Sequence, residues 1–179
     1  MLRSFEESGR ARRRYFIEGL GAAQFATGAT VDRLRSFSRE QDSTEPLIAV
    51  TLAATDPANP YGAALPWPSN APVETAVDST ADTDKKGHRP GRKAGALVVL
   101  VDGRLALFVE RGGKTMLTFG SDEPTLAAAA ASLAATIRRS GAKLKVEKAD
   151  GAFVIGTPLG TALTAAGFST TPQGLRMRG

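Results

Sequence analysis

The segment "ALVVLVDGRLALFVERGGKTMLTF", residues 96–119, decides the fold of this chain. It consists of three apolar runs that are separated by two short glycine turns. Residues 96–101 form a continuous apolar run, which is typical of a strand buried on both faces. Asp102-Gly103 is a strong signal for a two-residue hairpin, and Gly112-Gly113 marks a second turn. The segment therefore predicts a β-meander of three antiparallel strands.

Two helices are predicted after the meander. The first covers residues 123–140, which are rich in alanine, and Gly141 closes it. The second follows residue 157 and carries the usual signals at both ends. Thr157 is its N-cap, Pro158 its first residue, and Gly167 its C′ residue.

Further strands complete the predicted module. Residues 142–156, "AKLKVEKADGAFVIG", predict a hairpin that turns at Asp150-Gly151, and residues 174–179 predict a last short strand. The predicted fold class is therefore α+β, with an antiparallel β-barrel-like module and two flanking helices.

Residues 1–37 have a different organisation. A short helix is predicted at residues 1–9 and ends at Gly9. A basic strand through Phe16 and Ile17, a glycine turn and a second strand at residues 24–26 follow. This order of helix, strand, turn and strand predicts the last helix and the wing of a winged-helix domain. A further helix at 27–37 has Thr27 as its N-cap.

The sequence also predicts the domain boundaries. Residues 38–46 are polar and predict a loop after the winged-helix part. Residues 47–179 then form the β-barrel-like module. It contains a flexible insertion at about 69–92, because that stretch is acidic, then basic, and has no hydrophobic periodicity.

Composition excludes several kinds of site. The chain has no cysteine and a single histidine, His88, so disulfides, thiolate ligands and multi-histidine metal sites are excluded, and no metal is expected. No apolar run approaches the roughly 20 residues of a membrane helix, and no secretory segment is present at the start. We therefore expect a cytoplasmic location. The net charge of +5 favours an anionic partner.

Two basic clusters are the candidate nucleic-acid contacts. The first could be a strand edge that is kept charged against aggregation, but four arginines in five residues favour phosphate contact. Tyr15, Phe16 and Ile17 are expected to tie this hairpin into its domain. The second cluster is equally compatible with the solvated end of a linker. The candidate residues are Arg10, Arg12, Arg13 and Arg14, and then Lys85, Lys86, Arg89, Arg92 and Lys93.

The most unusual loop is "ATDPANPYGAALPWP", residues 54–68. One interpretation is a pocket in which Asp56 acts as an acid or a hydrogen-bond acceptor beside Tyr61 and Trp67. The favoured interpretation is structural, with Asp56 capping a turn and Trp67 filling one end of the barrel. Asp56 is the one catalytic candidate.

The sequence "GGKT" at residues 112–115 is similar to the end of a phosphate-binding loop. The motif needs a glycine five residues before Gly113, where this chain has Phe108, and it needs a helix afterwards. Here a strand pattern follows. We therefore predict a β-turn and no ATP binding by this chain.

Four blocks of the sequence resemble one family. They are "RRRYFIEGLGAAQFATGATVDRLR" (12–35), "LAATDPANPYGAALPWP" (52–68), residues 88–119, and "GFSTTPQGLRMRG" (167–179). In this order they resemble the C-terminal region of the Lhr-type large helicases, in the long actinobacterial or mycobacterial form. The resemblance implies superfamily 2 ATP-dependent DNA helicases linked to DNA repair. It also implies that tandem winged helices and a β-barrel module, similar to a family of bacterial DNA glycosylases, follow the motor.

The resemblance implies a nucleic-acid-binding or scaffolding accessory module without motor activity of its own. Alternatives are a part of a glycosylase-like catalytic region, or an assembly or oligomerisation scaffold. The glutamine pair of the related glycosylases is absent, because Gln24 stands alone. ATP and Mg²⁺ are expected only for the motor core of the parent hydrolase. Expected partners are DNA with single-stranded character, the winged-helix and motor domains of the same protein, and a homo-oligomer, with no membrane.

Overall fold

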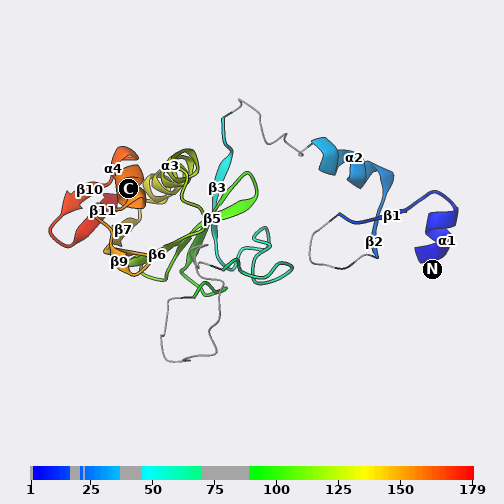
Figure 1. The fold of residues 1–179 in the computed structure, drawn as a ribbon, viewed down its shortest axis with the longest axis horizontal. Coiled ribbons are helices and arrows are strands. Elements are labelled where there is room, and N and C mark those ends of the chain that lie inside the picture. The colour runs from blue at the N-terminus through cyan, green and yellow to red at the C-terminus, as the bar shows by residue number, and fades with distance from the viewer. Residues whose placement is uncertain (1, 17–20, 22, 37–45, 70–88) are drawn as a thin grey trace, which may run out of the picture. The chain divides into compact units, whose positions relative to one another are not determined.

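The computed structural model describes residues 2–16, 21, 23–36, 46–69 and 89–179 (Figure 1). Almost all of the predicted polar loop at 38–46 and most of the predicted insertion at 69–92 lie outside these residues. The described chain divides into two compact units, Met1–Pro46 and Leu47–Gly179. Each unit is described by itself.

The first unit follows the predicted order of elements. Helix α1 (Leu2–Glu7) is followed by β1 (Arg12–Arg14), β2 (Gln24–Ala26) and α2 (Gly28–Ser36). Helix α1 ends in a Schellman motif, because the Gly9 N–H donates to Glu6 O and the Arg10 N–H donates to Phe5 O, at 3.0 and 2.9 Å. Gly9 supplies the positive φ of 72° that this ending needs. The predicted N-cap is confirmed, since Thr27 Oγ1 accepts from Thr30 N.

The predicted β-meander is confirmed in the second unit. Strands β4 (Leu97–Val101), β5 (Arg104–Val109) and β6 (Thr115–Thr118) pair antiparallel, and β3 (Ala49–Ala53) adds to the outer edge of β4. Asp102 and Gly103 both have positive φ, 46° and 79°, as a type I′ hairpin turn requires. The second turn runs from Glu110 to Gly113, where the Gly113 N–H donates to Glu110 O at 2.8 Å. The motif similar to a phosphate-binding loop therefore lies at a β-turn that leads into a strand, as predicted.

Both predicted helices are also confirmed. Helix α3 (Glu123–Ser140) ends at Gly141, which has left-handed φ of 65°. Helix α4 (Pro158–Ala165) begins after Thr157, whose side chain accepts from Gly160 N. Helix α3 packs against β3, β4, β11 (Gly174–Arg178) and α4, and Figure 1 shows α4 beside it.

The predicted single hairpin at residues 142–156 is wrong in one respect. The turn at Asp150-Gly151 is present, but it joins only β8 (Lys148–Ala149) and β9 (Ala152–Phe153). Strand β7 (Lys143–Val146) leaves the ladder at Glu147 and pairs with β11. Strand β8 in turn pairs parallel with β6. The hairpin is short because the two halves of the predicted strand belong to different sheets.

The predicted barrel does not close within the described residues. The strands form a six-stranded sheet in the order β3-β4-β5-β6-β8-β9, and a three-stranded sheet in the order β10-β11-β7, in which β10 is Ser169–Thr171. A closed barrel would need a continuous ladder. The change of partner at Glu147 interrupts it, and the result is two open sheets.

The central strands of the six-stranded sheet, β4, β5 and β6, are buried on both faces, as the apolar run at 96–101 predicts. Val99 and Leu107 contribute to a core that contains α3, α4 and the three-stranded sheet. Val98 and Phe108 belong to a second apolar cluster on the other face, which Trp67 covers. Trp67 therefore packs on a sheet face instead of filling a barrel end.

No helix in the described ranges is long and apolar enough to cross a membrane. The same part of the chain contains no group of three or more His, Cys, Asp or Glu that could hold a metal ion.

Candidate nucleic-acid interface

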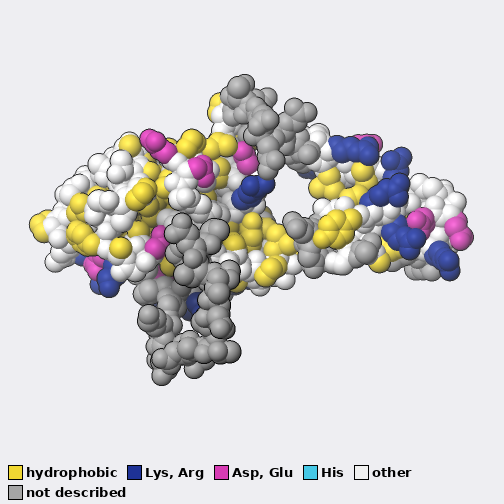
Figure 2. Space-filling view, viewed as in Figure 1, with side chains coloured by type: hydrophobic (Ala, Val, Ile, Leu, Met, Phe, Trp, Pro, Cys, Tyr) yellow, Lys and Arg dark blue, Asp and Glu magenta, His cyan; other side chains and the backbone are white. Residues whose placement is uncertain are grey.

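The basic residues of the first unit lie on a two-stranded hairpin. In β1–β2, Arg12 is paired with Ala26, Arg13 with Phe25, and Arg14 with Gln24. All three arginines are exposed, and Arg10 before them is exposed too. No acidic residue lies opposite them in the ladder. Figure 2 shows Lys and Arg side chains gathered on this unit.

Alternation along β1 separates the three arginines, as expected for a strand. Arg13 Nε lies 3.7 Å from Glu6 Oε1 of α1, and the two side chains are 59% and 36% exposed. Arg14 Nη1 donates to Arg13 O at 3.0 Å. Among the described residues, Arg10 and Arg12 have no ion-pair partner. The hairpin therefore carries more positive charge than its own fold neutralises.

Gln24 holds the turn of this hairpin. Its Oε1 accepts from Phe16 N at 3.0 Å, and its Nε2 donates to Gly21 O at 2.7 Å. Phe16 is half-buried, whereas the Tyr15 side chain is 59% exposed. The predicted role of Ile17 lies outside the described residues. An exposed tyrosine beside arginines is suited to stacking on a base.

The second basic cluster is only partly described. Lys85, Lys86 and His88 lie outside the described residues, while Arg89 and Lys93 are exposed. Arg92 instead points into the loop at 54–62. Its Nη1 donates to Asn59 O at 2.8 Å and Tyr61 O at 3.3 Å, and its Nη2 donates to Thr55 O and Asp56 O, both at 3.0 Å.

The loop around Asp56 has the structural arrangement that the sequence favoured. Asp56 Oδ1 accepts from Ala58 N at 2.8 Å and so caps the turn. Asn59 is buried, and its Nδ2 donates to Ala54 O at 2.9 Å. Trp67 stacks on Tyr61 with ring centroids 6.2 Å apart, and its edge meets Phe108 at 5.7 Å. These hydrogen bonds and ring contacts, together with the four hydrogen bonds from Arg92, stabilise the loop's conformation.

Comparison with known proteins agrees with this geometry. Residues 1–46 match the winged-helix domain of the large helicase-related protein family. The chain is 48% identical to a protein of Mycolicibacterium smegmatis described as Lhr helicase/probable uracil glycosylase, and the match covers 99% of the chain. It is 40% identical to the Lhr helicase/uracil glycosylase of Escherichia coli over 98% of its length. The chain belongs to the Lhr family of large helicases.

The resemblance predicted from the four sequence blocks is therefore confirmed. This Lhr-family chain spans only 12% and 11% of the lengths of these two relatives. The basic hairpin lies within the winged-helix match, at the place where the sequence predicts a wing.

Sequence reasoning missed a third group of cations in the Lhr-family chain. These side chains lie on the paired strands β7 and β11, where Lys145 faces Arg176 and Lys143 faces Arg178. The signal was present in "KLKV" and "LRMR", which alternate charged and apolar residues. Alternation alone does not say that the two strands are neighbours.

Proposed function

We propose that this chain is an accessory nucleic-acid-binding region of a large Lhr-type helicase, without motor activity of its own. The observation that carries the proposal is the exposed β1–β2 hairpin, with its row of arginines, inside the residues that match a winged-helix domain. In this proposal Arg12 and Arg14 contact phosphates on one side of the strand, and Arg10 extends the row.

Arg13 has a smaller role in this proposal. It lies on the opposite side of β1 and near Glu6, so its charge is partly offset and directed away from the row. Tyr15 adds an exposed ring beside the arginines. This combination favours a partner with single-stranded character, because the unpaired bases of a single strand are open to stacking on a ring. ATP and Mg²⁺ chemistry belongs, in this proposal, to the motor core of the parent protein in the cytoplasm.

The test is the salt dependence of DNA binding by the whole chain. Each phosphate that an arginine neutralises contributes about 0.7 to the slope of log K against log salt on a single strand. We expect Arg12→Ala/Arg14→Ala to lower the slope by about 1.4, and Arg13→Ala to change it little. The thermal midpoint should barely move, since exposed charges contribute little to stability.

The matched control is Arg33→Ala/Arg35→Ala, which removes the same charge from exposed positions on α2 of the same unit. An equal loss of slope in both double variants would mean that the overall charge of the unit, and not the hairpin, binds DNA. A wild-type slope near zero would instead favour the scaffold alternative.

A second candidate function is a part in base excision, because both relatives are described as helicase/uracil glycosylases. The purified chain would be incubated with single-stranded DNA that contains uracil, and release of the base would be measured. Release that is lost in Asp56→Asn would support catalysis by this chain. Our proposal expects no release, because the Asp56 carboxylate is engaged in capping its own turn.

A further inference from the structure

The outward face of the three-stranded sheet carries four cations in two facing pairs. Lys145 lies opposite Arg176, and Lys143 lies opposite Arg178. Side chains alternate along each strand, so these four residues share one face, which we call the cationic sheet face. The residues between them point inward and are buried: Leu144, Val146, Leu175 and Met177.

Folding does not need this arrangement. Like charges that lie directly opposite each other in a sheet are destabilising. Edge strands often carry lysines as protection against aggregation, which accounts for β7. It does not account for the arginines of β11, because β11 is the central strand in the order β10-β11-β7. The arginines therefore need another explanation.

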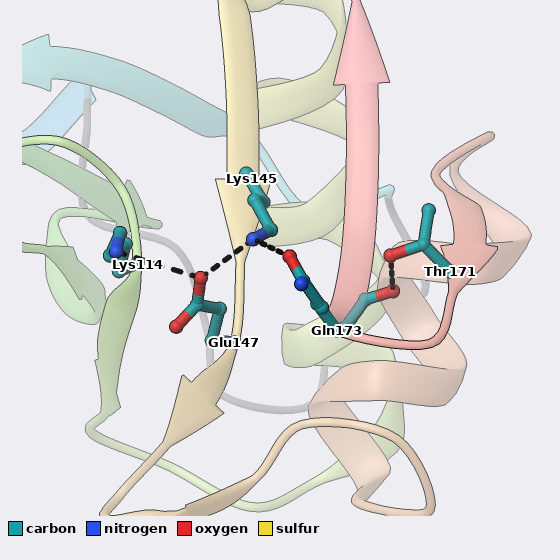
Figure 3. A network of polar contacts seen from close by, with 6 residues as sticks. Lys114, Lys145, Glu147, Thr171 and Gln173 are labelled. Atoms are coloured by element: carbon teal, nitrogen blue, oxygen red, sulfur yellow. Dashed lines mark hydrogen bonds and ion pairs between the residues drawn. The ribbon is translucent and has the colours of Figure 1, made fainter.

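The counter-charge on this face is small. Glu147 Oε1 lies 2.8 Å from Lys145 Nζ and 3.7 Å from Lys114 Nζ (Figure 3). The hydrogen bond from Lys145 lowers the pKa of Glu147, so this carboxylate is ionised at neutral pH. Across the described ranges, no carboxylate lies within ion-pair distance of Lys143, Arg176 or Arg178. Glu147 is thus the one carboxylate, among the described residues, that pairs with the four cations of this face and Lys114.

A pocket of about 510 Å³ opens beside these cations. Lys143, Lys145 and Arg176 line it, together with Gly112, Thr171 and Gln173. Gln173 Oε1 accepts from Lys145 Nζ at 2.6 Å, which fixes the lysine at the pocket (Figure 3). No carboxylate and no aromatic side chain is among the described residues that line the pocket. Its surroundings suit an anion and offer no ring for a base to stack on.

We propose that the cationic sheet face and its pocket bind the phosphodiester backbone of a nucleic-acid strand. Cations recur at every second residue of two paired strands, about 6.8 Å apart along each strand. Such a row matches a polyanion with regularly spaced charges better than a single small anion. Since no aromatic side chain is among the described residues that line the pocket, contact is to phosphates, and it carries no sequence preference. The inference rests on the proposed function and adds a second contact surface to it.

The experiment uses the whole chain and an oligothymidylate, with binding measured as a function of salt. The test variant is Lys143→Gln/Arg176→Gln, which removes two cations that have no acidic partner among the described residues. We expect the slope of log K against log salt to fall by about 1.4, at about 0.7 per phosphate on a single strand. The control is Arg104→Gln/Arg139→Gln, which removes equal charge from exposed positions away from this face, and we expect little change.

A second variant tests the same inference through an increase in DNA affinity instead of a loss. Glu147→Gln removes the carboxylate that forms ion pairs with Lys145 and Lys114. We expect tighter binding of the oligothymidylate by this variant. Thermal unfolding of each variant verifies that the fold is kept.

The outcomes separate this inference from the proposed function. If Arg12→Ala/Arg14→Ala lowers the slope while Lys143→Gln/Arg176→Gln does not, the cationic sheet face is not a contact and the hairpin proposal stands. Equal effects of the test and control variants would also overturn the inference. The inference would also be overturned if Lys143→Gln/Arg176→Gln lost the binding of inorganic pyrophosphate but still bound the oligothymidylate as wild type does. If the wild-type chain binds no nucleic acid at all, both proposals fail.

Discussion

Leu144 occupies the space that a side chain on Gly113 would need. A Cβ atom built on Gly113 would overlap Leu144 Cδ1, and Gly113 also has φ of 79°, which favours glycine. Through this contact between Gly113 and Leu144, the turn between β5 and β6 packs against β7. It thereby connects the two sheets and brings Gly112 to the wall of the pocket beside the cationic sheet face.

This relationship predicts that two adjacent glycines differ in their tolerance to alanine. Gly113→Ala should lower the free energy of unfolding by about 2–5 kcal/mol, because left-handed backbone strain and overpacking add together. Gly112 has a similar φ of 84°, but no atom lies within 4 Å of its Cβ position. Gly112→Ala should therefore cost only about 1–2 kcal/mol. Urea unfolding of both variants measures the difference, and equal losses would show that Leu144 moves aside freely.

Arg92 is predicted to stabilise the loop at 54–62 through its four carbonyl contacts. Arg92→Ala should lower the free energy of unfolding by about 2–3 kcal/mol, since charge-assisted hydrogen bonds are lost and carbonyls are left unsatisfied. Arg92→Lys keeps the charge but not the planar fork, so it should recover only part of the loss. The neighbouring Lys93→Ala, at an exposed position, should stay within about 0.5 kcal/mol of wild type.

The pair of Arg92 variants also tests the phosphate contact predicted for this residue. If Arg92 acts mainly by contacting DNA, Arg92→Lys will keep wild-type stability. Arg92→Ala will then change the salt slope of binding but not the unfolding midpoint.

Asp122 is predicted to give a pH-dependent contribution to the stability of α3. Its Oδ2 accepts from Thr125 N at 3.0 Å, and hydrogen bonding to Thr125 lowers the pKa of its carboxyl from 3.8, against a smaller effect of burial. A lowered pKa in the folded state means that the contribution is complete above the unfolded value. It is lost as pH falls through the folded value.

At neutral pH, Asp122→Ala should therefore cost about 1 kcal/mol, as for other N-cap replacements. Below pH 3.8 the difference in the free energy of unfolding between wild type and Asp122→Ala should become smaller. Asp122→Asn keeps an acceptor oxygen and should show a smaller loss with no pH dependence at this position. Urea unfolding at neutral and acidic pH measures all three proteins. A constant gap between wild type and Asp122→Ala would contradict the assignment of the cap.

Local chemistry explains what could be predicted from the sequence. Asp102-Gly103 specifies its hairpin because two consecutive residues must adopt positive φ. Thr157, Pro158 and Gly167 mark the ends of α4 because each satisfies a backbone requirement within a few residues of itself. The turn at Asp150-Gly151 was predicted for the same reason. These features depend on neighbours in the chain and need no knowledge of the rest of the fold.

Tertiary structure decided which strands became neighbours. The residues of β7 continue toward the hairpin at Asp150-Gly151, yet β7 pairs with β11, because there Leu144 and Val146 are buried against Leu175 and Met177. That choice brings Lys145 opposite Arg176 and creates the cationic sheet face. Tertiary structure also decided that Arg92 donates hydrogen bonds to backbone carbonyls more than thirty residues earlier in the chain. Turns and caps are determined by a few adjacent dihedral angles, whereas strand partners are chosen by burial across the whole core.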